Sequence, residues 1–160
     1  MASEMHLDAA RLVLRERWAA IATLNEGAPL VSMVAYAPRP DLSSLILFLS
    51  EMSAHTRNLL EDPRASLAIT TPDDHSGDPQ LLPRVTLDGK AELLAPESRA
   101  YADAKALYLA RFPDAAPRFD MADFHLFAFE PTSARYVGGF ARALRLDAGR
   151  LREAARSAST

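Results

Sequence analysis

Hydroxyl, basic and amide side chains gather in one short stretch of the sequence. In chain order they are Ser50, Ser53, His55, Arg57 and Asn58. Ser53 is placed to cap a short helix, because the stretch follows one strand-like apolar run and precedes another. Free backbone N–H groups at a helix start, combined with hydroxyl and basic side chains, make a binding site for phosphate. The chemistry that this stretch predicts is therefore the binding of an anion.

The charges of the expected helix run against its dipole. His55 and Arg57 lie in the first turn, where the dipole is positive, and Glu61 and Asp62 lie in the last. This arrangement costs a few tenths of a kcal/mol to about 1 kcal/mol per charge unless something compensates it. An anion at the N-terminus would do so. A solvated connecting helix with unoptimised charges explains the same pattern, and the stretch alone does not separate the two interpretations.

Composition limits the function classes. A chain of 160 residues with 49% hydrophobic and 24% charged residues is typical of one soluble globular domain. The lack of cysteine excludes disulfides, thiolate zinc sites and thiol catalysis. The N-terminus has no apolar signal region and no apolar run approaches ~18 residues, so we expect a cytoplasmic protein with no membrane partner. A net charge of −3 does not favour nucleic-acid binding.

The elements that must position the polar stretch are mostly strands. Asp8 is expected to cap a first helix, and Trp18, at helical spacing from Leu7 and Leu14, is expected to anchor the core. A second long helix is expected at 96–111, starting at Pro96. Alternating or apolar runs predict strands at 19–24, 29–37, 44–50, 64–71, 81–94, 124–130, 134–137 and 140–146.

Six or seven of these runs in hairpin-like succession, with helices at the periphery, predict a six- to seven-stranded antiparallel barrel of mainly β (α+β) class. Standard catalytic signatures are missing from the sequence, so we name no catalytic residue. The loop at 71–79 holds three aspartates and His75, but their spacing does not match a calcium loop. We therefore expect no metal site.

Several segments, in this order, resemble a known family. They are AIATL at 20–24, PLVSMV at 29–34, LS at 49–50 with HTRNL at 55–59, DPRASL at 62–67, PRVTLDGKA at 83–91 and RYVGGF at 135–140. Together they resemble the split β-barrel FMN-binding superfamily related to pyridoxamine 5′-phosphate oxidase, and most of all its heme-utilisation-type branch. The resemblance assigns residues 1–146 to one FMN-binding split-barrel domain and leaves 147–160 as a basic C-terminal tail, helical or disordered.

The resemblance implies a homodimer with FMN at the subunit interface. It puts the flavin phosphate beside Ser50, Ser53, His55 and Arg57, where the charge pattern independently suggests an anion. Asn58 would be a polar neighbour, Ser32 would lie beside the isoalloxazine ring, and Arg84 would reach the flavin, from the same or the other subunit.

The function that follows is FMN binding, with oxidoreductase activity on an unknown small molecule. Vitamin B6 oxidation is not expected, because the arginines and histidines that grip that substrate have no counterparts here. One alternative is a heme-binding or heme-degrading protein on the same barrel. Heme-degrading members use a histidine beyond the Gly-Gly-Phe element, and this chain has none after His125. A non-catalytic flavin-binding stress-response module is the third reading.

Overall fold

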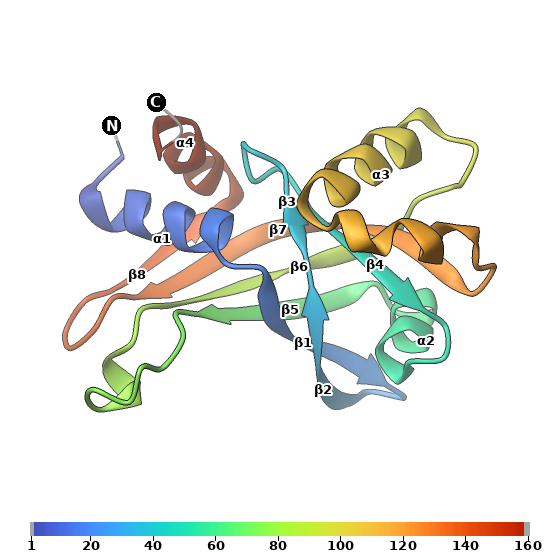
Figure 1. The fold of residues 1–160 in the computed structure, drawn as a ribbon. Helices are drawn as coiled ribbons and strands as arrows, with labels where there is room; N and C mark the ends of the chain where they lie inside the picture. The colour runs from blue at the N-terminus through green and yellow to red at the C-terminus, as the bar shows by residue number, and fades with distance from the viewer. Residues whose placement is uncertain (1, 159–160) are drawn as a thin grey trace.

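The structure is a computed structural model that describes residues 2–158 (Figure 1). The predicted tail residues Ser159 and Thr160 lie outside the described residues. The strands are β1 (Trp18–Asn25), β2 (Ala28–Ala35), β3 (Ala37–Pro38), β4 (Leu45–Ser50), β5 (Arg64–Thr70), β6 (Arg84–Leu93), β7 (Phe124–Val137) and β8 (Ala143–Asp147). The helices are α1 (Glu4–Arg15), α2 (Ala54–Glu61), α3 (Arg99–Arg111) and α4 (Ala148–Ala158), with short 3-10 segments η1 (Pro79–Leu81) and η2 (Pro113–Asp120).

All strands pair antiparallel in one curled sheet, as the sequence predicts. The order is β2-β1-β5-β6-β7-β4-β3, and β8 pairs with β7. The sheet curls until β2, at one edge, lies near β4, at the other side. No ladder joins these two strands within residues 2–158. This gap is the split in the barrel.

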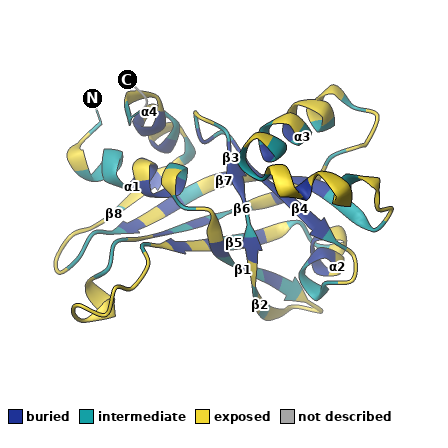
Figure 2. Ribbon diagram, viewed as in Figure 1, coloured by how far each residue is buried: buried dark blue, intermediate teal, exposed yellow. Residues whose placement is uncertain are grey.

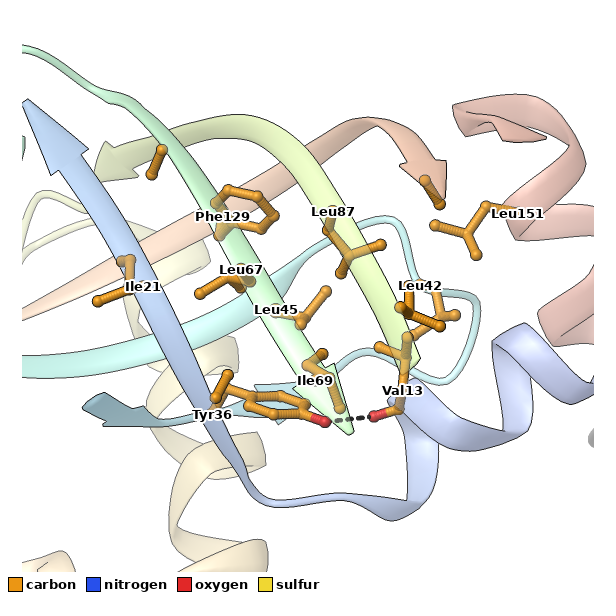
Figure 3. Close-up of a cluster of buried hydrophobic side chains, with 14 of the residues drawn as sticks. Val13, Ile21, Tyr36, Leu42, Leu45, Leu67, Ile69, Leu87, Phe129 and Leu151 are labelled. Carbon is orange, nitrogen blue, oxygen red and sulfur yellow. Dashed lines mark hydrogen bonds between the residues drawn. The ribbon is translucent and has the colours of Figure 1, made fainter. Parts of the chain in front are cut away.

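Each strand places alternate residues inside and outside the curl. Buried and exposed positions alternate along β5 and β6 (Figure 2). β4 is buried at all but its last residue, as its continuous apolar run predicts. The inward side chains pack with α1 and α4, and the hydroxyl of Tyr36 donates a 2.9 Å hydrogen bond to the carbonyl of Val13 (Figure 3). One core thus joins the sheet to the terminal helices.

β7 is one long strand where the sequence predicts two. It passes through Pro131, which lies opposite Gly89 at a bulge in β6. Proline has no N–H to donate, so it is tolerated in a ladder where the register is broken. Gly89 is needed there because a Cβ atom would collide with the carbonyl oxygen of Glu130.

Four local predictions are wrong. Ser3, not Asp8, caps α1, through a capping box with His6. Trp18 is not a core anchor: it starts β1 on the outward face and is 58% exposed, because the helix has already ended at Arg15.

The long helix starts at Arg99, not at Pro96. Ser98 is its cap, because the hydroxyl of Ser98 accepts a hydrogen bond from the N–H of Tyr101 in the first turn. The last strand starts at Ala143 because Phe140 and Ala141 form a turn, with Ala141 in the left-handed region. Residues 148–158 form α4, whose Leu151 is fully buried. Among residues 2–158, no helix has the length and apolar character needed to cross a membrane.

Candidate functional site

A cleft of about 280 Å³ opens at the split between β2 and β4. α3 and η2 contribute its far wall, and the start of α2 contributes the near wall. It is lined by Trp18, Met33, Val34, Ala35, Phe48, Leu49, Ser50, Ser53, His55, Tyr108, Arg118 and Phe124. These described lining residues include no carboxylate, so the cleft is electrostatically suited to an anion.

A second, larger cavity of about 710 Å³ lies beside the cleft on the outward face of the sheet. Trp18 and Met33 line both spaces. Its floor includes the small side chains of Ala20 and Ala68, which lie opposite each other on β1 and β5. The two spaces are therefore neighbours: a narrow cleft that contains the polar groups, and a broad, mostly apolar cavity.

The start of α2 faces the cleft, which Ser53 and His55 line. Ser53 is the N-cap by position, but its hydroxyl makes no hydrogen bond to α2 or to any other residue within 2–158. The first N–H groups of a helix have no partner inside the helix. Ser50 is less available, because its hydroxyl donates a 2.5 Å hydrogen bond to Asp123 and accepts one from the N–H of Met52.

His55 reaches back to β2. Its Nδ1 lies 2.8 Å from the hydroxyl of Ser32, within hydrogen-bonding distance. Ser32 is thus a support for His55 at the rim of the site. Burial lowers the pKa of His55 below its ordinary value of 6.5, so the ring is neutral at pH 7. The bond at Nδ1 fixes the ring and leaves Nε2 without a partner in the described chain.

Of the two basic side chains in the first turn of α2, only His55 lines the cleft. Arg57 is exposed, does not line the cleft, and donates from Nη1 to the carbonyls of Glu51 and Met52. At the other end of α2, hydrogen bonds from Arg64 lower the pKa of Asp62 to about 2. Local partners therefore compensate much of the inverted charge, and the pattern alone does not require a bound anion.

Asn58 and Arg84 lie outside the cleft. The amide of Asn58 is buried and donates a 3.0 Å hydrogen bond to the hydroxyl of Thr23 on β1. Arg84 lines the larger cavity, where its Nη1 donates to the carbonyls of Gln80 and Leu82. Asn58 is thus held in a structural bond, and Arg84 belongs to the broad end of the site.

The chain matches the family described as "CREG, beta-barrel" over residues 3–149. It belongs to this family. The resemblance to split-barrel proteins predicted from the sequence is confirmed.

Two relatives of the chain are named for heme. The chain is 39% identical over 119 residues to the chloroplastic non-canonical heme oxygenase HOZ of Arabidopsis thaliana, covering 74% of this chain and 34% of that protein. A heme-binding protein from Mycobacterium smegmatis shares 32% identity at a TM-score of 0.84, covering 96% of this chain and 62% of that one. The chain thus spans about a third of the plant relative and under two thirds of the mycobacterial one.

The fold extends to the pyridoxine-phosphate oxidase side of the superfamily. A protein from Clostridium acetobutylicum related to general stress protein 26 superposes with a TM-score of 0.70 at 16% identity, covering 92% of this chain and 97% of that one. At this identity the likeness concerns the fold alone.

The residues of the far wall of the cleft in this CREG-type barrel were not predicted from the sequence. Tyr108 falls on the predicted helix face, but nothing in the pattern says that the face meets a ligand site. Arg118 lies in η2, a segment that its prolines mark only as a helix stop. Asp123, which accepts a hydrogen bond from Ser50, lies in the turn just before β7. These residues are distant in sequence from 50–58, and only the folded chain joins them.

Proposed function

We propose that the protein binds a planar, anionic redox cofactor, with FMN as the first candidate. The observation that carries this proposal is the pairing of a narrow polar cleft with a broad apolar floor. Ser53, His55 and the free N–H groups of α2 suit a phosphate. Trp18 and Met33 suit an aromatic ring system, since ligand sites combine apolar walls with a few polar groups.

The energies fit a flavin of micromolar affinity, which corresponds to about 8 kcal/mol. Hydrogen bonds to a charged group contribute roughly 1.5–3 kcal/mol each. Two or three of these with burial of the ring reach that affinity after the costs of association. A bound flavin supplies hydride or electron transfer. The residues of this chain bind it, orient it and exclude water.

Heme is a second candidate, and His55 provides a specific reason for it. A neutral imidazole whose one nitrogen is held by a hydrogen bond is the usual form of a metal-ligating histidine. Nε2 of His55 is in that condition beside the cleft. The heme names of the Arabidopsis and Mycobacterium relatives support the same reading.

We also propose that a second copy of the chain covers the larger cavity. Val31 and Met33 are exposed on the outward face, and their partners in β1 are the small residues Ala22 and Ala20. Exposed apolar surface of this kind marks an interaction site. Because Trp18 and Met33 line both spaces, a second copy on this face also closes the ligand site, as in a homodimer with the cofactor at its interface.

The decisive experiment is a titration of the purified protein with FMN and with hemin, followed by absorbance and flavin fluorescence. We expect FMN to bind with a Kd in the micromolar range or below. A Soret shift on hemin addition that disappears in His55→Ala would favour the heme candidate. Failure of both ligands to bind below about 100 μM would refute the proposal.

Two further measurements test the remaining parts. Sedimentation should give a dimer for the wild-type chain and a monomer for Met33→Glu. If both sediment as monomers, the homodimer proposal is wrong.

Anaerobic reduction of bound flavin by NADH or NADPH would identify a flavin-dependent oxidoreductase on a small molecule in the cytoplasm. If neither NADH nor NADPH reduces the bound flavin, a non-catalytic flavin-binding module is favoured.

A further inference from the structure

The far wall of the cleft holds a tyrosine hydroxyl that has no protein partner within residues 2–158. Tyr108 is only 3% exposed and lines the cleft, yet its hydroxyl makes no hydrogen bond within residues 2–158. Tyr36, by contrast, uses its hydroxyl to bond the carbonyl of Val13. The hydroxyl of Tyr108 is not among the fully buried unpaired atoms of the described residues, so it opens into the cleft that the residue lines. An unpaired phenol that lines a cleft is therefore a donor awaiting a ligand or water.

A cationic side chain, that of Arg118, lies near the hydroxyl of Tyr108. Arg118 lines the same cleft from η2 and, in the described part of the chain, its guanidinium makes neither an ion pair nor a hydrogen bond. Burial raises the pKa of Tyr108, and the charge of Arg118 partly opposes that shift. The phenol is thus protonated at neutral pH and acts as a donor, next to a guanidinium that also only donates.

An aromatic cluster fixes this wall. The ring of Phe48 stacks on Phe119, the neighbour of Arg118, with centroids 3.9 Å apart and planes 7° apart. It also meets the ring of Tyr108 edge-on at 5.6 Å. Phe48 lies on β4, so the α3–η2 layer is tied to the strand that leads into α2. The wall is preorganised, which lowers the ordering cost of binding.

We infer that Tyr108 and Arg118 form the second half of an anion cradle, opposite Ser53 and His55, that selects ligands ending in a phosphate or carboxylate. This inference rests on the proposed function and deepens it. Nothing in the sequence pattern marks these two residues. The four side chains come from α2, α3 and η2 and line one cleft of about 280 Å³, with no carboxylate in its described lining to compete.

The test compares ligands that differ only in the anionic end. FMN and riboflavin share the ring and differ in the phosphate. We expect Arg118→Gln to weaken FMN binding about 10-fold, since a charged hydrogen bond is lost at an exposed and partly screened position. Tyr108→Phe should weaken it about 3- to 10-fold. Riboflavin affinity should change by less than 2-fold in both variants.

The matched control is Arg99→Gln. It removes the same charge from α3 at a side chain that is 94% exposed, and it should change neither affinity. If heme is the ligand, hemin and its dimethyl ester replace FMN and riboflavin in the same design. Equal losses for the charged and uncharged ligand, or no loss for either, would overturn the inference while leaving the proposed function standing.

A second readout needs no cofactor. Millimolar inorganic phosphate, compared with chloride at the same ionic strength, should raise the wild-type Tm by a few degrees, because it binds only the folded state. The rise should vanish in Arg118→Gln and Tyr108→Phe and persist in Arg99→Gln. If no cofactor binds but this pattern holds, the proposed function fails and the cradle stands. If phosphate has no effect on the wild type and no cofactor binds, both fail.

Discussion

Replacing Asn58 by alanine separates a structural role of this side chain from a ligand-binding one. Its Nδ2 donates to Oγ1 of Thr23 at 3.0 Å, and both side chains are buried. Thr23 faces inward from β1, so the bond ties α2 to the barrel. If that is its role, the variant should lose stability and keep its affinity for ligand.

The expected loss follows from the contacts. Asn58→Ala leaves the hydroxyl of Thr23 buried without a partner, which costs about 1–3 kcal/mol. The volume vacated by the amide adds a cavity contribution. We expect the free energy of unfolding to fall by about 2–3 kcal/mol, which for a chain of this size lowers Tm by roughly 4–12 °C.

Urea unfolding followed by circular dichroism measures the loss, and Thr23→Val completes a double-mutant cycle. The double variant should lose about 1 kcal/mol less than the sum of the single variants, because the two side chains share one bond. The FMN affinity of Asn58→Ala, measured well below its transition, should stay within 2-fold of the wild type. A coupling energy near zero together with a 10-fold loss of FMN affinity would show that Asn58 contacts the ligand instead.

Three more predictions follow from the same structure. Burial holds the pKa of His55 below 6.5 in the free protein, and a bound anion raises that pKa. The affinity for FMN, measured by calorimetry, should therefore rise as the pH falls from 7.5 to 5.5, by at most about 10-fold per pH unit. His55→Gln should abolish that dependence. Because the pKa of His55 is lower in the folded chain, the unfolded chain binds a proton more readily. The contribution of neutral His55 to the free energy of unfolding is therefore complete above pH 6.5 and is lost as the pH falls below it. An unchanged urea midpoint from pH 7.5 to 5.5 would contradict this. Tyr36→Phe removes the 2.9 Å bond to the carbonyl of Val13 and should lower the free energy of unfolding by about 1–3 kcal/mol in thermal denaturation; a change under 0.3 kcal/mol would count against that bond. Gly89→Ala should destabilise by more than about 2 kcal/mol because its Cβ meets rigid backbone, whereas Gly77→Ala should lose far less because its Cβ meets nothing within 4 Å.

The sequence predicted those parts of the fold that local periodicity determines. The apolar run at 44–50 became the buried strand β4, and most of the strand predicted at 81–94 became β6, because each pattern matches the faces of a pleated strand. The continuity of β7 through Pro131 was missed, since it depends on a bulge in another strand. The exposure of Trp18 was missed because a tryptophan in an amphipathic pattern is usually buried.

The near wall of the site was predictable and the far wall was not. Ser53 and His55 stand at a helix start that the composition marks, so their place at the cleft follows from local rules. Arg57 and Asn58 share the same composition signal but point elsewhere. Side chains on a helix turn about 100° per residue, so neighbours in sequence face different surroundings. Tyr108 and Arg118 reach the cleft only through the packing of α3 and η2 on β4.

Unpaired polar groups identify this site better than its charges do. The inverted charges of α2 first suggested an anion, yet Arg57 is bonded to backbone carbonyls and Asp62 to Arg64. Each of those groups has a protein partner and needs no ligand. The hydroxyls of Ser53 and Tyr108 have none within residues 2–158, and neither is among the fully buried unpaired atoms, so both are open to a ligand or to water. A protein keeps such groups where a ligand or water completes them, and both of these hydroxyls line the cleft between β2 and β4.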